Sequence, residues 1–195
     1  MRRSLAAAAL AGLVLASCGT DAMSADDYFA AAQDAAVTYD EAAAEISAQY
    51  AAALDDTIAD FATSGASADD PVALGNLAGE AASQAIVSLG ATGIALEQYG
   101  IAVSDLTPPV AAEAAHGEFV ASLTASVAAV APSVERLASV ASVNDLGPAV
   151  AGSPFSDARP RLERACIALQ EVGEASGVTV DLRCVPAAAV IDDAP

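Results

Sequence analysis

Apolar side chains recur at steps of three and four residues along the first long segment, which is the spacing of one helix face. The positions are Tyr28, Ala32, Ala35, Tyr39, Ala42, Ile46, Tyr50, Ala53 and Phe61. Ser24 and Asp27 form a capping-box pattern before them, and Ser64-Gly65 provides a stop. The pattern predicts a helix over 25–62, whose tyrosines are interpreted as core and rim residues rather than a binding site.

A second helix is predicted to begin at "DDPVALG", where Asp70 suits the N-cap and Pro71 suits the first turn. Its apolar residues lie on several faces, at Leu74, Leu77, Ile86, Val87, Leu89, Ile94, Leu96 and Ile101. Such a helix is expected to be largely surrounded by other helices. A membrane-spanning segment is the alternative, and Glu80 and Glu97 argue against it.

A third helix is predicted from "SDLTPPVAAEAAH", with Thr107 as N-cap and the two prolines after it in the first turn. The helical stripe that follows begins with Glu113 and His116 and continues with the apolar residues Val120, Leu123, Val127, Val130, Val134 and Leu137. Pro132 interrupts this stripe, so we expect a kink or a fresh short helix there. A loop containing Asn144, Gly147, Pro148, Gly152 and Pro154 is expected next.

The last helix is predicted to begin near Ser156-Asp157 and to end at Ser176-Gly177. The segment "VTVDLRC" then alternates apolar and polar residues, which indicates an extended chain with one buried face. The fold class is therefore all-α, a bundle of about four helices over 24–185 with a short extended C-terminal segment. Residues 186–195 lack periodicity and are expected to be a disordered tail.

The first residues of the chain have the three-part order of a secretory signal: Arg2-Arg3, an apolar run over 5–16, and small residues. The run is shorter than the roughly 20 residues that a membrane-spanning helix needs. "LASC" at its end resembles the lipobox of bacterial lipoproteins. The resemblance implies a signal peptide over 1–17, acylation of Cys18 with palmitate-type chains, and a linker over 18–23. The alternative is an ordinary signal peptide with a chance cysteine.

Cysteine arithmetic agrees with the lipobox, because lipidation of Cys18 would leave two of the three cysteines to pair in an oxidising compartment. From Cys166 to Ser176 a helix advances ~15 Å. After a reversal at Gly177, an extended chain returns ~20 Å to Cys184. The two paths nearly cancel, so we predict a Cys166–Cys184 disulfide; two unpaired, packed thiols are the alternative.

The acidic helical body, "LTPPVAAEAAH" and the ending "ACIALQEVGEASGVTVDLRC" are similar to uncharacterised small alanine-rich lipoproteins of actinobacterial type. The resemblance covers most of the mature chain. It implies a lipid-anchored location and brings no functional residue with it.

The charge of the chain is strongly negative, with a formal net charge of −19, and its cations are all arginines. Removal of residues 1–17, which carry two arginines and no acid, leaves −21. Such a field repels nucleic acid and anionic headgroups, so no nucleic-acid partner is expected and attachment must come from acyl chains. The simplest interpretation of the acidic residues is a solvated surface that keeps the protein soluble, and the alternatives are adaptation to high salt or a sink for cations. The paired acidic residues do not have the spacing of a calcium-binding loop.

The sole histidine, His116, lies three residues after Glu113 on one helix face, a pairing found in di-metal bundles. An inter-helix ligand or metal site near His116, formed with Glu113, Glu97 and Tyr99, is therefore one hypothesis. The alternative is a histidine that is hydrogen-bonded to a carboxylate or carbonyl.

Known catalytic patterns are missing from the sequence: there is no Gly-x-Ser-x-Gly elbow, no phosphate loop and no Cys-x-x-Cys. We therefore expect no cofactor and no enzyme. The sequence favours a structural or interaction bundle, anchored by lipid on the extracytoplasmic face of the cell membrane, with an envelope protein or a small ligand as partner.

Overall fold

The computed structural model describes residues 22–67 and 69–184. The predicted signal peptide, Cys18 and the tail over 186–195 lie outside these residues. The described residues contain six helices: α1 (Ala25–Thr63), α2 (Pro71–Ser104), α3 (Glu113–Ala128), α4 (Val130–Ala138), α5 (Val143–Ala151) and α6 (Pro154–Ala175). The prediction of an all-α bundle of about four helices is confirmed: α1, α2, the consecutive pair α3 and α4, and α6 correspond to the four, and α5 is an additional short helix.

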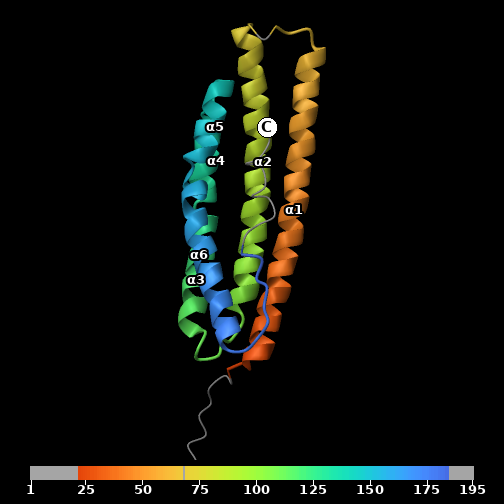
Figure 1. Ribbon diagram of the computed structural model, residues 1–195. Helices are drawn as coiled ribbons and strands as arrows, with labels where there is room; N and C mark the ends of the chain where they lie inside the picture. The colour runs from red at the N-terminus through yellow and green to blue at the C-terminus, as the bar shows by residue number, and fades with distance from the viewer. Residues whose placement is uncertain (1–21, 68, 185–195) are drawn as a thin grey trace, which may run out of the picture.

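The helices run up and down the long axis of the molecule (Figure 1). α1 and α2 form a long hairpin, α3 and α4 follow one another back along α2, and α6 returns beside α3. α1 packs chiefly against α2, and α6 packs chiefly against α3. α2 is therefore the central helix, and α1 and α6 lie on different sides of it.

The predicted starts of the first two helices are confirmed. The Ser24 hydroxyl accepts a bond from the backbone N–H of Asp27 at 3.1 Å and donates to the Asp27 carboxylate at 2.6 Å. The Asp70 carboxylate accepts from the N–H of Val72 at 2.9 Å, with Pro71 in the first turn. These side chains satisfy N–H groups that have no partner inside the helix.

The expectation that the second helix is largely surrounded is wrong for one of its faces. Val87, Ile94 and Ile101 follow each other at intervals of seven residues and are 66%, 59% and 55% exposed. The opposite face carries buried Leu96 and Val103. The neighbouring helices cover only part of the circumference of α2. Apolar residues on every face of this helix therefore did not indicate that every face is buried.

The third helix begins later than predicted. α3 starts at Glu113 with Ala112 as its cap residue, whereas Thr107 was the predicted N-cap. A residue that precedes proline is disfavoured in the helical conformation. In "TPP" this restriction applies to both Thr107 and Pro108, so the helix does not begin there. The chain then makes a turn, in which the N–H of Ala112 donates to the carbonyl of Pro109 at 2.8 Å.

The break near Pro132 is confirmed as a fresh short helix, since α3 ends at Ala128 and α4 begins at Val130. Proline has no N–H to donate to the carbonyl four residues earlier. The loop predicted after α4 is wrong in part, because it contains α5. The Ser142 hydroxyl donates to the Asp145 carboxylate at 2.8 Å at the start of α5, and Ala149 is buried against other helices.

The last helix begins two residues before its predicted start. Ser153 is the N-cap, its hydroxyl accepts from the N–H of Ser156 at 3.2 Å, and Pro154 occupies the first turn. The predicted end is confirmed at Ser176-Gly177, where Gly177 adopts a φ of +82°. That left-handed conformation is the one that glycine adopts without strain.

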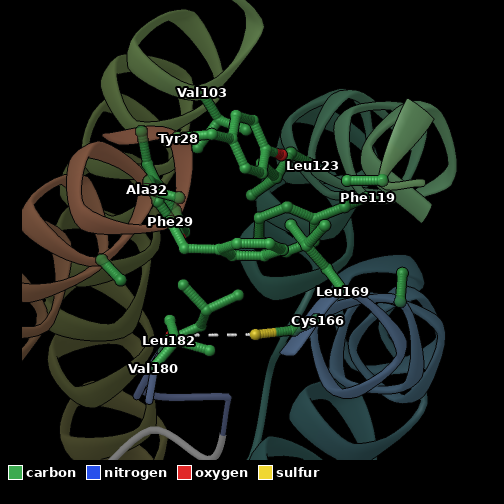
Figure 2. Packing of buried hydrophobic residues seen from close by; sticks show 14 of the residues in the cluster. Tyr28, Phe29, Ala32, Val103, Phe119, Leu123, Cys166, Leu169, Val180 and Leu182 are labelled. Carbon is green, nitrogen blue, oxygen red and sulfur yellow. Dashed lines mark hydrogen bonds between the residues drawn. The ribbon is translucent and has the colours of Figure 1, made fainter. Parts of the chain in front are cut away.

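Aromatic and branched side chains from α1, α2, α3 and α6 form the main core, which lies near the end of the bundle where α1 begins. Figure 2 shows Tyr28, Phe29, Ala32, Val103, Phe119, Leu123, Cys166, Leu169, Val180 and Leu182 in this cluster. Burial of one such large apolar side chain contributes ~1.5–3 kcal/mol. A smaller cluster around Ala85 and Leu137 lies further along the bundle.

The C-terminal segment follows the predicted alternation. Val180 and Leu182 are buried, while Thr179, Asp181 and Arg183 are exposed. The N–H of Asp181 donates to the side-chain oxygen of Gln33 on α1 at 2.9 Å, and the N–H of Leu182 donates to that of Gln170 on α6 at 3.1 Å. The segment therefore joins α1 to α6.

The predicted Cys166–Cys184 disulfide is confirmed, and its Cα atoms are 5.4 Å apart. The Sγ of Cys166 also lies 3.7 Å from the carbonyl oxygen of Leu182 (dashed line in Figure 2). The disulfide fixes the extended segment against the last helix.

Two helical stretches, Pro71–Ser104 and Glu113–Ala138, are long and apolar enough to cross a membrane by length and composition alone. The same stretches supply Leu96, Val103, Phe119 and Leu123 to the core.

Gly173 is expected to be intolerant of a side chain, because the C-terminal segment packs directly on it. A Cβ at this position would lie 2.7 Å from Val180 Cγ1 and 3.1 Å from Phe29 Cε1. Gly173→Ala should lower the free energy of unfolding by about 1–3 kcal/mol, the usual effect of overpacking. Urea unfolding measures this change.

Gly79→Ala is the matched control, since a Cβ at Gly79 would meet no atom within 4 Å. This substitution should raise stability by up to ~1 kcal/mol through helix propensity. Equal stabilisation by the two substitutions would contradict the close packing of Val180 on Gly173.

Candidate functional site

The sole histidine lies against the first turn of α1. His116 Nδ1 and the Tyr28 hydroxyl share a hydrogen bond of 2.9 Å, and their rings meet edge to face at 5.9 Å. Burial lowers the pKa of His116 from its usual 6.5 and raises the pKa of Tyr28 to about 12. His116 therefore has a tyrosine partner, where a carboxylate or a carbonyl was expected.

The four residues predicted to form a ligand or metal site lie in different surroundings. Glu97 and Glu113 are exposed, His116 is half-buried, and Tyr99 is buried in the core. Within 22–67 and 69–184, no hydrogen bond or ion pair joins either glutamate to His116, and no three metal-binding side chains are grouped to hold an ion. The site near His116 remains a sequence prediction, which the metal content of wild type and His116→Ala would test.

The partial burial of His116 predicts that the stability of the fold depends on pH. Burial holds the pKa of His116 in the folded chain below the value of 6.5 that it has in the unfolded chain. At pH values between these two pKa values the unfolded chain binds more protons than the folded chain. The contribution of His116 to the free energy of unfolding is therefore complete above pH 6.5 and is lost as the pH falls from 6.5 through the lower pKa of the folded chain. Wild type should lose more stability than His116→Gln when urea unfolding is compared at about pH 7.5 and about pH 5.5. An equal loss in both proteins would contradict this origin.

Tyr99, one of the four residues of the predicted site, borders a cavity between α1 and α6. Its ring stacks on Tyr39 with a centroid distance of 5.1 Å and an interplanar angle of 10°, and it meets Phe119 edge to face at 5.7 Å. Its hydroxyl is buried and has no hydrogen-bond partner among the described residues. Burial, with smaller contributions from Tyr39 and Tyr28, raises the pKa of Tyr99 well above its usual value.

Tyr99→Phe is expected to stabilise the protein by about 1 kcal/mol, because an unpartnered buried hydroxyl carries an uncompensated desolvation penalty. Tyr28→Phe is the matched control, since it removes a hydroxyl that is bonded to His116. It should destabilise by about 1 kcal/mol. Thermal unfolding of both variants checks the pair, and destabilisation of similar size in both would contradict it.

The space between α1 and α6 contains three adjoining cavities, which together we call the α1–α6 groove. The disulfide cavity, of about 50 Å³, is bordered by Tyr99 and by both bridged cysteines. The middle cavity, of about 160 Å³, shares Tyr39 and Arg159 with it. One end of the groove is therefore formed by the C-terminal segment, which fills the space between α1 and α6 there.

The upper cavity, of about 210 Å³, continues the groove and shares Thr92 and Phe155 with the middle cavity. Its other lining residues include Tyr50 on α1 and Leu89 on α2. A cavity of ~150 Å³ with apolar walls is large enough to hold benzene. The middle and upper cavities therefore offer space for a ligand, whereas the disulfide cavity holds only a very small group.

Arg159 stands at the junction of the disulfide and middle cavities. Among the described residues it forms no ion pair, whereas Arg161 pairs with Glu118 at 2.9 Å and Arg183 pairs with Asp181 at 3.3 Å. Burial raises the pKa of Tyr39, and the nearby Arg159 guanidinium partly opposes that rise. A cation without a partner thus lies beside a desolvated tyrosine.

Sequence reasoning did not single out Arg159, although a signal for it exists. Arg159 is three residues before Leu162 and seven before Cys166, so it belongs to the apolar stripe of the last helix. A charge inside an apolar stripe is a recognisable exception. Tertiary packing places this stripe of α6 opposite α1. The sequence pattern of one helix could not predict which helix lies opposite.

No protein-family model, no curated protein and no solved structure matches this chain. The geometry of the groove and the sequence around Cys18 are therefore the grounds for assigning a function.

Proposed function

We propose that this protein is a lipid-anchored bundle on the extracytoplasmic face of the cell membrane, and that it acts by binding rather than by catalysis. The anchor is Cys18, after cleavage of a signal peptide over 1–17. Two or three acyl chains make a durable attachment, whereas one chain alone binds marginally. The acidic surface favours an envelope protein or a small ligand as partner over a nucleic acid.

The anchor and the bundle fit together geometrically. The backbone N–H of Met23 donates to the carbonyl of Thr107 at 3.2 Å, so the chain enters the bundle where α2 is joined to α3. Met23 is five positions after Cys18, so the two Cα atoms are at most ~18 Å apart. A lipid on Cys18 would therefore hold this end of the bundle next to the membrane, and the far ends of α1 and α2 would point away.

The observation that carries the binding role is the α1–α6 groove. It is a concave, largely apolar site, and at the end nearest the disulfide it has Arg159, which forms no ion pair within 22–67 and 69–184. Concave apolar sites with few polar groups are the usual form of small-ligand sites. His116, the residue most suited to acid–base chemistry, is bonded to Tyr28 and borders none of the three cavities.

Comparison of material bound to the native lipoprotein and to a groove-filling variant tests this role. Ala43 lines the middle cavity, and Ala43→Phe would fill it, while Ala44→Phe places the same side chain at an exposed position of α1. Mass spectrometry should find a co-purified small molecule with wild type and Ala44→Phe that is depleted with Ala43→Phe. Identical material on all three proteins would contradict a binding role for the groove.

A further inference from the structure

The middle and upper cavities have an unusual distribution of charge for so acidic a chain. Arg159 is the one charged residue that lines either of them within the described part of the chain. The net charge of the whole chain is −19. The acidic residues that dominate the surface are thus absent from these walls, and the single charge present is positive.

The polar groups at the lower end of these cavities are available to a ligand. Arg159 has no ion-pair partner in the described residues, and the hydroxyl of Tyr39 forms no hydrogen bond there. The Arg159 guanidinium is close enough to Tyr39 to oppose the rise in its pKa. A guanidinium and a hydroxyl together provide donors for a carboxylate.

The walls above these groups are mostly apolar. Leu96 and Leu162 line the middle cavity, Phe155 lines both cavities, and Leu89 and Leu137 line the upper one. Tyr39 and Tyr50 mark the two ends on α1, about 16 Å apart at ~1.5 Å per residue. The site is therefore elongated, with a cationic end and an apolar body.

We propose that the middle and upper cavities bind a single-chain anionic amphiphile of the fatty-acid class. The carboxylate is held by Arg159 and Tyr39, and the alkyl chain extends along α1 toward Tyr50. This assignment rests on the binding role proposed above and names its ligand class; it does not depend on the lipid anchor.

Glu163 sets the direction in which the ligand lies. It borders the disulfide cavity together with Arg183, which pairs with Asp181, and it borders neither of the other two cavities. A carboxylate in the disulfide cavity would therefore be repelled by Glu163. The head group lies on the middle-cavity side of Arg159, and the small disulfide cavity stays outside the site.

Calorimetric titration with sodium dodecanoate tests this proposal on the disulfide-bonded chain from Gly19 onward, which contains every described residue and needs no detergent. We expect one molecule bound per chain below the micellar concentration. Dodecyltrimethylammonium has the same chain with a cationic head, and it should bind at least about tenfold more weakly. Each two-carbon shortening of the acid should weaken binding about tenfold.

Paired variants locate the binding to this site. Arg159→Gln should weaken dodecanoate binding about tenfold. Arg164→Gln, an equal charge change at another exposed arginine of α6 that lines neither cavity, should leave it unchanged. Ala43→Phe should abolish binding and Ala44→Phe should retain it. Circular dichroism melting shows whether each variant is folded.

Absence of dodecanoate binding to wild type would overturn the proposal, as would equal affinity in Arg159→Gln and Arg164→Gln. Binding of the cationic amphiphile that is as tight as that of dodecanoate and is lost in Ala43→Phe would also overturn it, because Arg159 would then play no part in the groove. None of these results affects acylation of Cys18. A co-purified ligand of another class that is lost in Ala43→Phe would leave the general binding role intact.

Discussion

Cys18→Ala is expected to abolish incorporation of a fatty-acid analogue into the protein in its native cells, and to move the protein out of the membrane fraction or leave it unprocessed. The thiol of Cys18 is the proposed site of lipid attachment, and alanine offers no atom to carry it. With ~0.8 kcal/mol per buried CH₂, loss of two or three acyl chains removes essentially all of the membrane affinity. Metabolic labelling followed by fractionation measures both effects.

The strongly acidic surface of the bundle opposes electrostatic attachment to anionic headgroups, which is why loss of the acyl chains is expected to have a large effect. A net charge of −19 repels anionic headgroups. Ser17→Ala is the matched control, because it changes the neighbouring residue to another small one and leaves the thiol in place. Equal labelling of wild type and Cys18→Ala would refute the anchor.

Cys184→Ser is expected to lower the free energy of unfolding by about 3 kcal/mol, which is the chain-entropy value for closing a loop of this size. The cysteines are 18 residues apart, and the bridge holds Val180 and Leu182 in the core between α1 and α6. A loss of this size is a large fraction of the ~5–15 kcal/mol that stabilises a typical domain. Urea unfolding under non-reducing conditions measures it.

The reducing agent provides an internal control for this prediction. Reduction of the wild type should lower its stability to that of Cys184→Ser, and the same treatment should leave the variant unchanged. The double variant lacking Cys166 and Cys184 should match the single one. Two free thiols in unreduced, denatured mature protein, or full stability in Cys184→Ser, would contradict the disulfide.

The elements with strong local signals were predictable from the sequence. The caps at Ser24 and Asp70 and the stop at Gly177 depend on hydrogen bonds and dihedral angles within a few residues. The Cys166–Cys184 pairing was also predictable, because it follows from the rise per residue of a helix and of an extended chain.

Elements in which two local rules compete were predicted less well. At Thr107 the rule that proline suits the first helical turn competed with the restriction that proline imposes on the residue before it, and the second rule prevailed. Around Gly147 and Pro148 the turn-forming composition indicated a loop. Burial of Ala149 against other helices nevertheless accompanies a helix there, which is a tertiary effect.

The candidate site could be predicted only in part for a similar reason. Tyr99 was named from the sequence, whereas Arg159 was not, and Glu97 and Glu113 are exposed. Spacing along one helix shows which residues share a face, and it gives no information about which helix lies opposite. The partnership of His116 with Tyr28 joins residues 88 positions apart, so only the fold reveals it.

The central claim is that the mature protein begins at an acylated Cys18, and the mass of its N-terminal peptide tests this most directly. Asp-N protease cleaves before Asp21 and would release residues 18–20 from protein extracted from membranes. We predict a peptide that starts at Cys18 and carries the added mass of a diacylglycerol group on sulfur. A mature protein that starts at another residue, or a Cys18 with an unmodified thiol, would contradict the account.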